Sequence, residues 1–349
     1  MPNKNIFFNE AIRKSILTSI KKDKRIILMG LGVDDPKGVF GTTLNIHKKF
    51  RNQVFDLPTA ENSFTGFALG LAISGFKPII VHQRVEFSLL SIEQIFNQIS
   101  KWHYMSGGKV NVPLVIRLIV GKGWGQGPQH SQSLETIFAH IPGLKVVAPT
   151  NPDNAYWLLK ESIKDKNPVI FFEHRWLHGT FGNLKKKHTY KIGQAVFEKF
   201  GKDISIISFS YSILECLKAS KYLKKNYNIN CEILNLLSLK PLDKNKILKT
   251  SKKNKKILII DNGMTEYGIS AEISALINEN FKIKKDIYRM GVLNAPIPST
   301  VALAKHYYPE ADKIAKKVLN ILKIKSKVSL KELQRNNPDQ PDKNFTGPF

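Results

Sequence analysis

Three loops carry the side chains best suited to chemistry, and each follows a short apolar segment. The first ends in a carboxyl group, Glu61, at the start of a Gly- and Ala-rich stretch. The second runs from His82 to an aromatic ring at Phe87, and the third is rich in glycine and contains His130. A carboxyl group and an imidazole are residue types that enzymes use for general acid–base catalysis.

Taken singly, each of these residues has a simpler structural explanation. Glu61 fits a helix-start carboxylate stabilised by the helix dipole. His130 fits a capping or hydrogen-bonding histidine, and Phe87 fits a core residue. The Gly-rich loop lacks the Lys-Ser/Thr pair of a phosphate-binding loop and the dinucleotide-binding fingerprint. The interpretation as a site therefore depends on their occurrence together and in this order.

Alternating strands and helices would bring these loops to one edge of a sheet. Apolar segments in the first half predict strands at 26–29, 54–57, 78–82, 113–120, 145–148 and 169–173. Helical spacing predicts a first helix with Ile12 and Ile16 on its apolar face, then helices at 64–74, about 88–105, 134–141 and 153–163. Ligands of open parallel sheets bind at the carboxyl ends of strands. The three loops follow such ends.

The second half repeats this rhythm, so the fold class expected is α/β with two doubly wound domains. Its strands are predicted at 204–209, 231–235, 256–261 and 287–290, with helices at 213–223, 244–250 and 269–278 and a last one to about 324. We place the first domain at 1–180, a polar linker at 181–193, the second domain at 194–325 and a polar tail at 326–349.

Composition indicates a globular protein without a membrane span. The longest apolar runs are strand-sized, far below the roughly 20 residues that cross a bilayer. Residues 1–24 lack the apolar core and cleavage site of a signal peptide. The two cysteines, Cys216 and Cys231, show no metal-site spacing and are expected to be buried thiols. These features predict a cytoplasmic protein.

The net charge of +26 is the unusual value. It could serve nucleic acid, a membrane surface or an acidic partner. Most of the excess is lysine spread over solvent-facing positions, and no helix interleaves basic with aromatic residues along one face. We therefore interpret the charge as a lysine-rich solvated surface, expect no membrane or nucleic-acid partner, and leave open docking on an acidic protein.

Several longer motifs, in order, carry a resemblance to a known family. They are Thr59-Ala60-Glu61-Asn62, Tyr104-Met105-Ser106-Gly107-Gly108, Gln129-His130-Ser131-Gln132-Ser133, Ile141-Pro142-Gly143-Leu144-Lys145 and Tyr267-Gly268-Ile269-Ser270-Ala271-Glu272. Over residues 5–325 the chain resembles the beta subunits of pyruvate, branched-chain 2-oxo acid and acetoin dehydrogenases. The resemblance implies a transketolase-like pyrimidine-binding domain followed by a transketolase C-terminal-like domain.

The resemblance implies roles for the three candidate residues. Glu61 matches the family acid that hydrogen-bonds a pyrimidine ring nitrogen of thiamine diphosphate and favours the imino tautomer. Phe87 matches the aromatic residue that stacks on that ring, and His130 an active-site histidine that stabilises intermediates or the incoming lipoyl group. Some of these subunits also bind a structural K⁺ ion through backbone oxygens. The matching positions are Leu114, Ser162, Ile163, Asp165 and Asn167.

A motif that is missing points to a partner. The superfamily binds Mg²⁺ and the cofactor's diphosphate with Gly-Asp-Gly followed by Asn, and no Gly-Asp-Gly occurs in this sequence. The resemblance implies that an alpha subunit supplies this half, in a heterotetramer of two alpha and two beta chains. It also implies oxidative decarboxylation of a 2-oxo acid, with acyl transfer to a lipoyl carrier on an acyltransferase core.

Departures from the family pattern leave the substrate open. The loop after the first strand lacks the usual Gly-Glu-Asp, and the Gly-rich loop carries Lys122, Trp124 and Gln126. Two alternatives therefore stay in view. One is half of a split transketolase or synthase with an aldehyde acceptor. The other is a basic binding module with a retired site, which the retention of Glu61, Phe87 and His130 disfavours.

Overall fold

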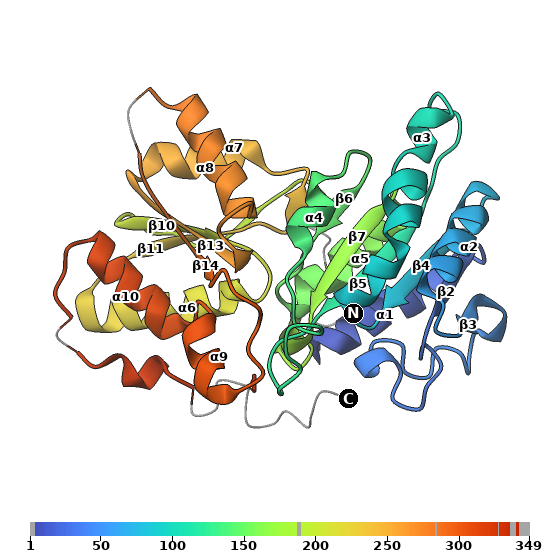
Figure 1. The fold of residues 1–349 in the computed structure, drawn as a ribbon, viewed down its shortest axis with the longest axis horizontal. Helices are drawn as coiled ribbons and strands as arrows, with labels where there is room; N and C mark the ends of the chain where they lie inside the picture. The colour runs from blue at the N-terminus through green and yellow to red at the C-terminus, as the bar shows by residue number, and fades with distance from the viewer. Residues whose placement is uncertain (1–3, 187–189, 283–284, 327, 336–339, 342–349) are drawn as a thin grey trace.

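Two twisted sheets, each covered by helices on both faces, divide the protein into two α/β domains (Figure 1). The computed structural model describes residues 4–186, 190–282, 285–326, 328–335 and 340–341. Within these residues the first sheet has seven strands and the second has five. The expected class, two doubly wound α/β domains, is confirmed.

The first sheet runs in the order β12-β6-β7-β5-β4-β2-β3. All its neighbours pair in parallel except β12, which joins from the second half of the chain and runs antiparallel to β6. Its strands are β2 (Ile26–Gly30), β3 (Val54–Asp56), β4 (Lys77–His82), β5 (Val115–Val120), β6 (Lys145–Val147), β7 (Val169–His174) and β12 (Ser238–Lys240).

Helices cover both faces of this sheet because its strands are apolar on both sides. One face is packed by α1 (Phe8–Ile20) and α5 (Pro152–Lys164). In α1 the apolar side chains of Ile12, Ile16 and Ile20 follow helical spacing and are buried. The other face is packed by α2 (Glu61–Ile73) and α4 (Glu135–His140), together with the segment between Val85 and Met105.

The helix expected at about 88–105 is broken into three pieces. They are the 3₁₀ turns η3 (Val85–Ser91), the π-helical η4 (Gln94–Ile99) and the short α3 (Trp102–Met105). Ile95 and Ile99 point into the core, as their helical spacing predicts, whereas Leu89 of the same predicted face is 37% exposed. Spacing of three and four residues does not distinguish one continuous helix from such pieces. The break leaves Phe87 in a turn directly after β4.

The second sheet has the order β14-β13-β10-β11-β9. Its strands are β9 (Val196–Lys199), β10 (Ile204–Ser208), β11 (Cys231–Asn235), β13 (Lys256–Met264) and β14 (Asp286–Val292), and only β9 is antiparallel. The helices of this domain are α6 (Ser212–Tyr227), α7 (Lys244–Lys253), α8 (Ile269–Asn280), α9 (Val301–Tyr307) and α10 (Ala311–Ile321).

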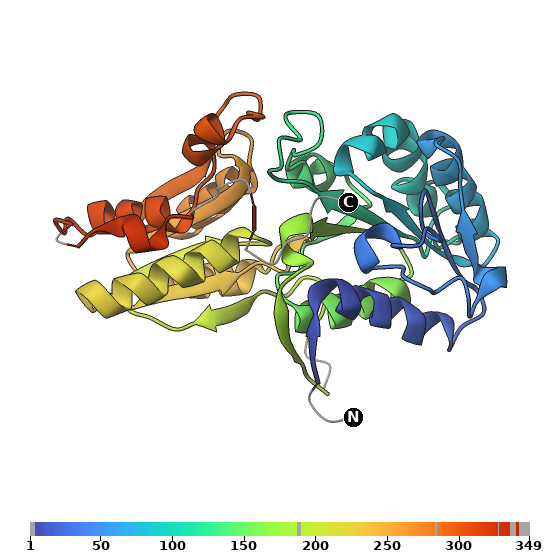
Figure 2. The ribbon, with the colours of Figure 1, turned by 90° about the horizontal axis from the view of Figure 1, so that it is seen from below.

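Two segments outside the predicted domains are structured. In the linker, β8 (Phe181–Leu184) pairs antiparallel with β1 (Lys4–Phe7), so the chain's beginning is tied to the junction (Figure 2). In the tail, η6 (Leu330–Leu333) packs on α6 and α10. The tail residues 342–349 and the linker residues 187–189 lie outside the described residues.

Both cysteines are buried free thiols within the described structure, as predicted. Burial raises the pKa of the Cys231 thiol to about 11, which keeps it protonated at neutral pH. No helix in the described ranges has the length and apolar character needed to cross a bilayer.

Candidate active site

The three predicted loops leave the same edge of the first sheet. Glu61 follows β3, Phe87 follows β4 and His130 lies in the loop after β5, and these strands are parallel members of one sheet. Strand β2 lies between β3 and β4. The carboxyl ends of parallel strands meet at one edge, so the fold brings all three loops to the position where such sheets bind ligands.

Glu61 is the first residue of α2 and is only 7% exposed. The preceding residue, Ala60, provides no side-chain cap, so the carboxylate is the acidic group in the first turn. The positive end of the helix dipole favours an anion there. Among the residues that the structure describes, none gives the Glu61 carboxylate a hydrogen bond or an ion pair. A shielded carboxyl group without a protein partner is available to a ligand.

Phe87 and His130 lie in direct contact. Their ring centroids are 5.6 Å apart at an interplanar angle of 79°, an edge-to-face arrangement. His130 Nδ1 is buried and has no hydrogen-bond partner in the described part of the chain. Buried polar atoms in native proteins are nearly always bonded, so an orphaned nitrogen at a ligand-binding edge suggests a ligand or water partner.

Two polar contacts join the loops that carry Phe87 and His130. The Gln132 backbone N–H donates to Glu86 Oε1 at 2.6 Å, and Arg84 Nε donates to Gln126 Oε1 at 3.2 Å. Burial raises the pKa of Glu86 to about 7. The pKa of Glu135, one turn beyond this loop, is raised to about 8 by burial and by the nearby carboxylates of Asp261 and Glu86. Two hydrogen bonds therefore hold the two loops together.

His82 has a structural role despite its place in the second loop. Its ring is buried against Phe64, with centroids 5.1 Å apart, and Nε2 lies 3.4 Å from Thr65 Oγ1. Burial lowers the pKa of His82 to about 3, so the ring is neutral at physiological pH. It helps to fix α2, the helix that begins at Glu61.

The groups at this sheet edge match the chemistry of an aminopyrimidine ring. With neighbouring strands about 4.8 Å apart, the ends of β3 and β4 are separated by roughly 10 Å, because β2 lies between them. An aminopyrimidine has a polar edge that can bond a carboxyl group and a face that can stack on an aromatic ring. The unpartnered Glu61 carboxyl, the Phe87 ring and the orphaned His130 nitrogen fit such a group.

The residues predicted to bind K⁺ gather at the opposite edge of the sheet. Leu114 O accepts the Val169 N–H at 2.9 Å, and Ser162 O accepts the Asp165 N–H at 3.2 Å. Ile163 is in the last turn of α5, and the Asp165 carboxylate is paired with Lys145 at 2.6 Å. Asn167 Oδ1 is buried without a hydrogen-bond partner among the described residues. In the described ranges no three His, Cys, Asp or Glu side chains cluster as a metal site.

Sequence reasoning missed the polar residues that hold these loops in place. The sequence indicates no partners for Arg84 and Glu86, and the buried group around Lys122 was not predicted. The local signal was a charged residue close to the end of an apolar strand, as at Lys122, two residues after β5. Such a signal does not name the partner, which comes from distant parts of the chain.

Comparison with known proteins identifies both domains. Residues 4–179 match the family model described as "Transketolase, pyrimidine binding domain", and residues 193–314 match "Transketolase, C-terminal domain". Among solved structures, the chain is similar to "Split gene transketolase, inactive beta4 tetramer". The TM-score is 0.76 at 19% identity, with coverage of 92% of this chain and 99% of that one. That likeness shows the fold alone.

Curated relatives are more specific. The chain is 34% identical to the beta subunit of acetoin:2,6-dichlorophenolindophenol oxidoreductase from Cupriavidus necator, over 87% of this chain and 94% of the relative. It is 36% identical to the pyruvate dehydrogenase E1 component subunit beta of Cyanidium caldarium, over 92% and 99%. For the mitochondrial Saccharomyces cerevisiae subunit the identity is 32%, over 92% and 90%.

These matches cover nearly the whole length of both partners in each comparison. They agree with the loops at one sheet edge and with the order of the two domains. The split-transketolase and binding-module alternatives find no support among these relatives. The chain belongs to the family of E1 beta subunits of thiamine-diphosphate-dependent 2-oxo acid dehydrogenases.

Proposed function

We propose that this chain binds the aminopyrimidine half of thiamine diphosphate for oxidative decarboxylation of a 2-oxo acid. The observation that carries the proposal is the arrangement of three groups at one sheet edge: the partnerless Glu61 carboxyl, the Phe87 ring and the orphaned His130 nitrogen. The cofactor, when bound, supplies the electron sink for decarboxylation. This chain's residues supply orientation and proton positions.

Each residue has one physical task. Glu61 holds a proton between its carboxyl group and a ring nitrogen of the cofactor. Phe87 presents its ring face to the pyrimidine and keeps water from that side. His130 offers Nδ1 as a hydrogen-bond partner for substrate oxygen or for the incoming lipoyl group. The contacts from Arg84 and Glu86 to its loop hold His130 against Phe87.

The partner would be an alpha subunit that binds Mg²⁺ and the diphosphate. Large apolar side chains are exposed on α2, η3 and α3: Phe67 is 61% exposed, Leu90 67% and Tyr104 86%. Figure 1 places α2 and α3 on the side of the first domain that faces away from the second domain. Apolar surface of this kind favours protein–protein contact. We propose two alpha and two beta chains, docked on a lipoyl acyltransferase core.

Activity is expected only in the presence of the alpha subunit. The chain alone should show no thiamine-diphosphate-dependent turnover, because half of the cofactor site lies on the other subunit. Co-expression with the candidate alpha gene product, followed by assay of a panel of 2-oxo acids with an artificial electron acceptor, measures this. Turnover by the isolated chain would contradict the half-site. No turnover with any 2-oxo acid by an assembled complex would contradict the reaction.

The K⁺ site is a separate proposal. Carbonyl oxygens of Leu114, Ser162, Ile163, Asp165 and Asn167 would be the ligands, and the unpartnered Asn167 side-chain oxygen supports a cation nearby. K⁺ at a hundredfold excess over its Kd is expected to stabilise the chain by about 2.7 kcal/mol. Thermal melts in KCl and in tetramethylammonium chloride at equal ionic strength measure this. Equal melting temperatures would remove the proposal. The cytoplasmic location stays a prediction, since several of the relatives are mitochondrial.

A further inference from the structure

The tail after α10 is fastened along the second domain. Tyr222 OH donates to the carbonyl oxygen of Val328 at 3.1 Å, and the Val328 N–H donates to Tyr227 OH at 3.0 Å. Leu330 and Leu333 pack against the core between α6 and α10. This course brings the tail back to the junction of the two domains. Arg335 lies at this junction.

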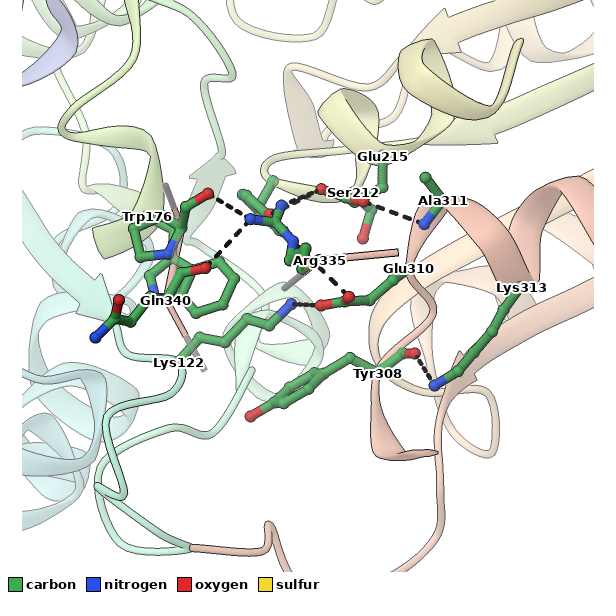
Figure 3. A network of polar contacts seen from close by, with 12 residues as sticks. Lys122, Trp176, Ser212, Glu215, Tyr308, Glu310, Ala311, Lys313, Arg335 and Gln340 are labelled. Atoms are coloured by element: carbon green, nitrogen blue, oxygen red, sulfur yellow. Dashed lines mark hydrogen bonds and ion pairs between the residues drawn. The ribbon is translucent and has the colours of Figure 1, made fainter. Parts of the chain in front are cut away.

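Arg335 occupies a pocket built by both domains (Figure 3). Its guanidinium donates to Glu215 Oε1 at 2.5 Å and to the Tyr211 hydroxyl, and Nε lies 3.8 Å from Glu310 Oε2. It also lies over the ring of Trp176, with its central carbon 5.2 Å from the centroid. Trp176 belongs to η5 (Arg175–Leu177) of the first domain, whereas Tyr211 and Glu215 belong to the second.

A second cation shares this pocket. Lys122 Nζ donates to Glu310 Oε1 at 3.1 Å, so the Glu310 carboxylate lies between the ammonium and the guanidinium. The ammonium is 4.2 Å from the ring centroid of Tyr308 and 4.4 Å from that of Trp176, within range for cation–π attraction. Two carboxylates, Glu215 and Glu310, thus face two cations in a buried space. Removal of either cation leaves a carboxylate undercompensated.

Lys122 connects this pocket to the candidate active site. It begins the loop that contains His130, and the two ends of that loop are packed backbone to backbone. A Cβ atom on Gly121 would lie 2.0 Å from the carbonyl oxygen of His130. No side chain fits there, so any shift of residues 121 and 122 moves His130 as well. The Glu310–Lys122 contact therefore links the second domain to the start of the His130 loop.

We propose that Trp176, Tyr211, Glu215 and Glu310 form a guanidinium-binding pocket at the domain junction, which Arg335 fills in cis. Filling the pocket positions the His130 loop through Glu310 and Lys122. The pocket itself is independent of the reaction, whereas the consequence for turnover rests on the proposed function. Arg335 is a positioning residue. The planar fork of a guanidinium suits two carboxylates and an aromatic face, which a lysine in its place would not reproduce.

The test uses the full-length chain with Arg335→Ala and a small probe, ethylguanidinium chloride at millimolar concentration. The variant is expected to melt at least about 5 °C lower than the wild type. Its tryptophan emission should shift, because Trp176 lines the pocket and its ring centroid is 5.8 Å from that of Trp124. Ethylguanidinium should restore both properties in a saturable way, whereas ethylammonium at equal concentration should not.

Hydrogen–deuterium exchange reports on the loop without any assay of activity. Amides in residues 121–133 should exchange faster in Arg335→Ala and slow again when ethylguanidinium is added. Arg51→Ala, which removes an exposed arginine of the first domain, is the matched control and should change none of these readouts. Arg335→Lys, which keeps the positive charge but loses the planar guanidinium, should melt between the wild type and Arg335→Ala.

Several results would overturn the proposal. A wild-type melting temperature and emission in Arg335→Ala would show that the pocket needs no guanidinium, and a non-saturable probe response would show that the pocket is not specific for it. Unchanged exchange at 121–133 would exclude the coupling to His130. In the complex with its alpha subunit, Arg335→Ala should lose about tenfold in kcat, recovered by the probe. An inactive wild-type complex would contradict the proposed reaction. The melting temperature, the tryptophan emission and the hydrogen–deuterium exchange would then still test the pocket on their own.

Discussion

Replacement of Glu61 by Gln is expected to lower kcat of the assembled enzyme by roughly 10²–10⁴-fold, the range that one positioned acid–base group contributes. Gln keeps the size and hydrogen-bonding ability of the side chain but cannot hold or release the proton. Glu61 has no partner among the described residues, so the change breaks no internal contact there. The fold and the association with the alpha subunit should therefore be unchanged.

Steady-state kinetics on the complex, together with size-exclusion chromatography, measure both parts of this expectation. Glu279→Gln is the matched control, because Glu279 is an exposed carboxylate at the end of α8 in the second domain. It should keep wild-type activity. A Glu61→Gln complex with wild-type kcat would contradict the role of this carboxyl group. Loss of assembly would instead show that Glu61 is structural.

The placement of the site followed from local patterns. Runs such as 26–29 and 113–120 are apolar on both faces, which is typical of buried parallel strands, and their carboxyl ends had to share an edge. These patterns were enough to predict that the loops of Glu61, Phe87 and His130 lie together. Their chemical roles came only from the family resemblance, because a carboxylate at a helix start is by itself an ordinary stabilising feature.

Contacts between distant segments could not be predicted in this way. Strand β12 leaves the second half to pair with β6, and β8 in the expected linker pairs with β1. Arg335 lies in a polar tail whose composition resembles that of a mobile segment. Its partners, Glu215 and Trp176, are separated from it by more than a hundred residues. Local periodicity carries no information on such pairings.

The charged residues within the strands of the first sheet show the same limit. β5 turns Val115, Arg117 and Ile119 to the face covered by α1 and α5, and its other residues to the opposite face. Arg117 interrupts an otherwise apolar strand, and local patterns do not indicate its partner. In the structure its guanidinium binds the Glu173 carboxylate of β7 at 2.5 and 3.0 Å, and both side chains are fully buried.

Arg117→Leu is expected to lower the free energy of unfolding by about 3–5 kcal/mol, because it leaves the Glu173 carboxylate buried without a cation. It also removes the hydrogen bond from Arg117 to Thr42 Oγ1, 2.7 Å long, which ties the loop after β2 to the sheet. Chemical denaturation followed by circular dichroism measures the change. Lys164→Leu is the control. Its ion pair with Glu161 is exposed, and its loss should cost at most about 1 kcal/mol.

A second expectation follows from the pKa of Glu173, which the Arg117 guanidinium holds below its ordinary value although burial acts to raise it. Without Arg117, only the contact with His178 Nε2, at 3.4 Å, opposes burial, and we expect the folded-state pKa of Glu173 to rise above its unfolded value near 4.5. The folded protein then binds the proton more tightly, so the stability of the variant falls as pH increases above about 4.5. The loss of stability in Arg117→Leu should be larger at pH 8 than at pH 5.

The double variant Arg117→Leu/Glu173→Leu removes both charges and should recover most of the lost stability. A double variant as unstable as Arg117→Leu would show that packing around β5 and β7, and not the unpaired carboxylate, sets the cost.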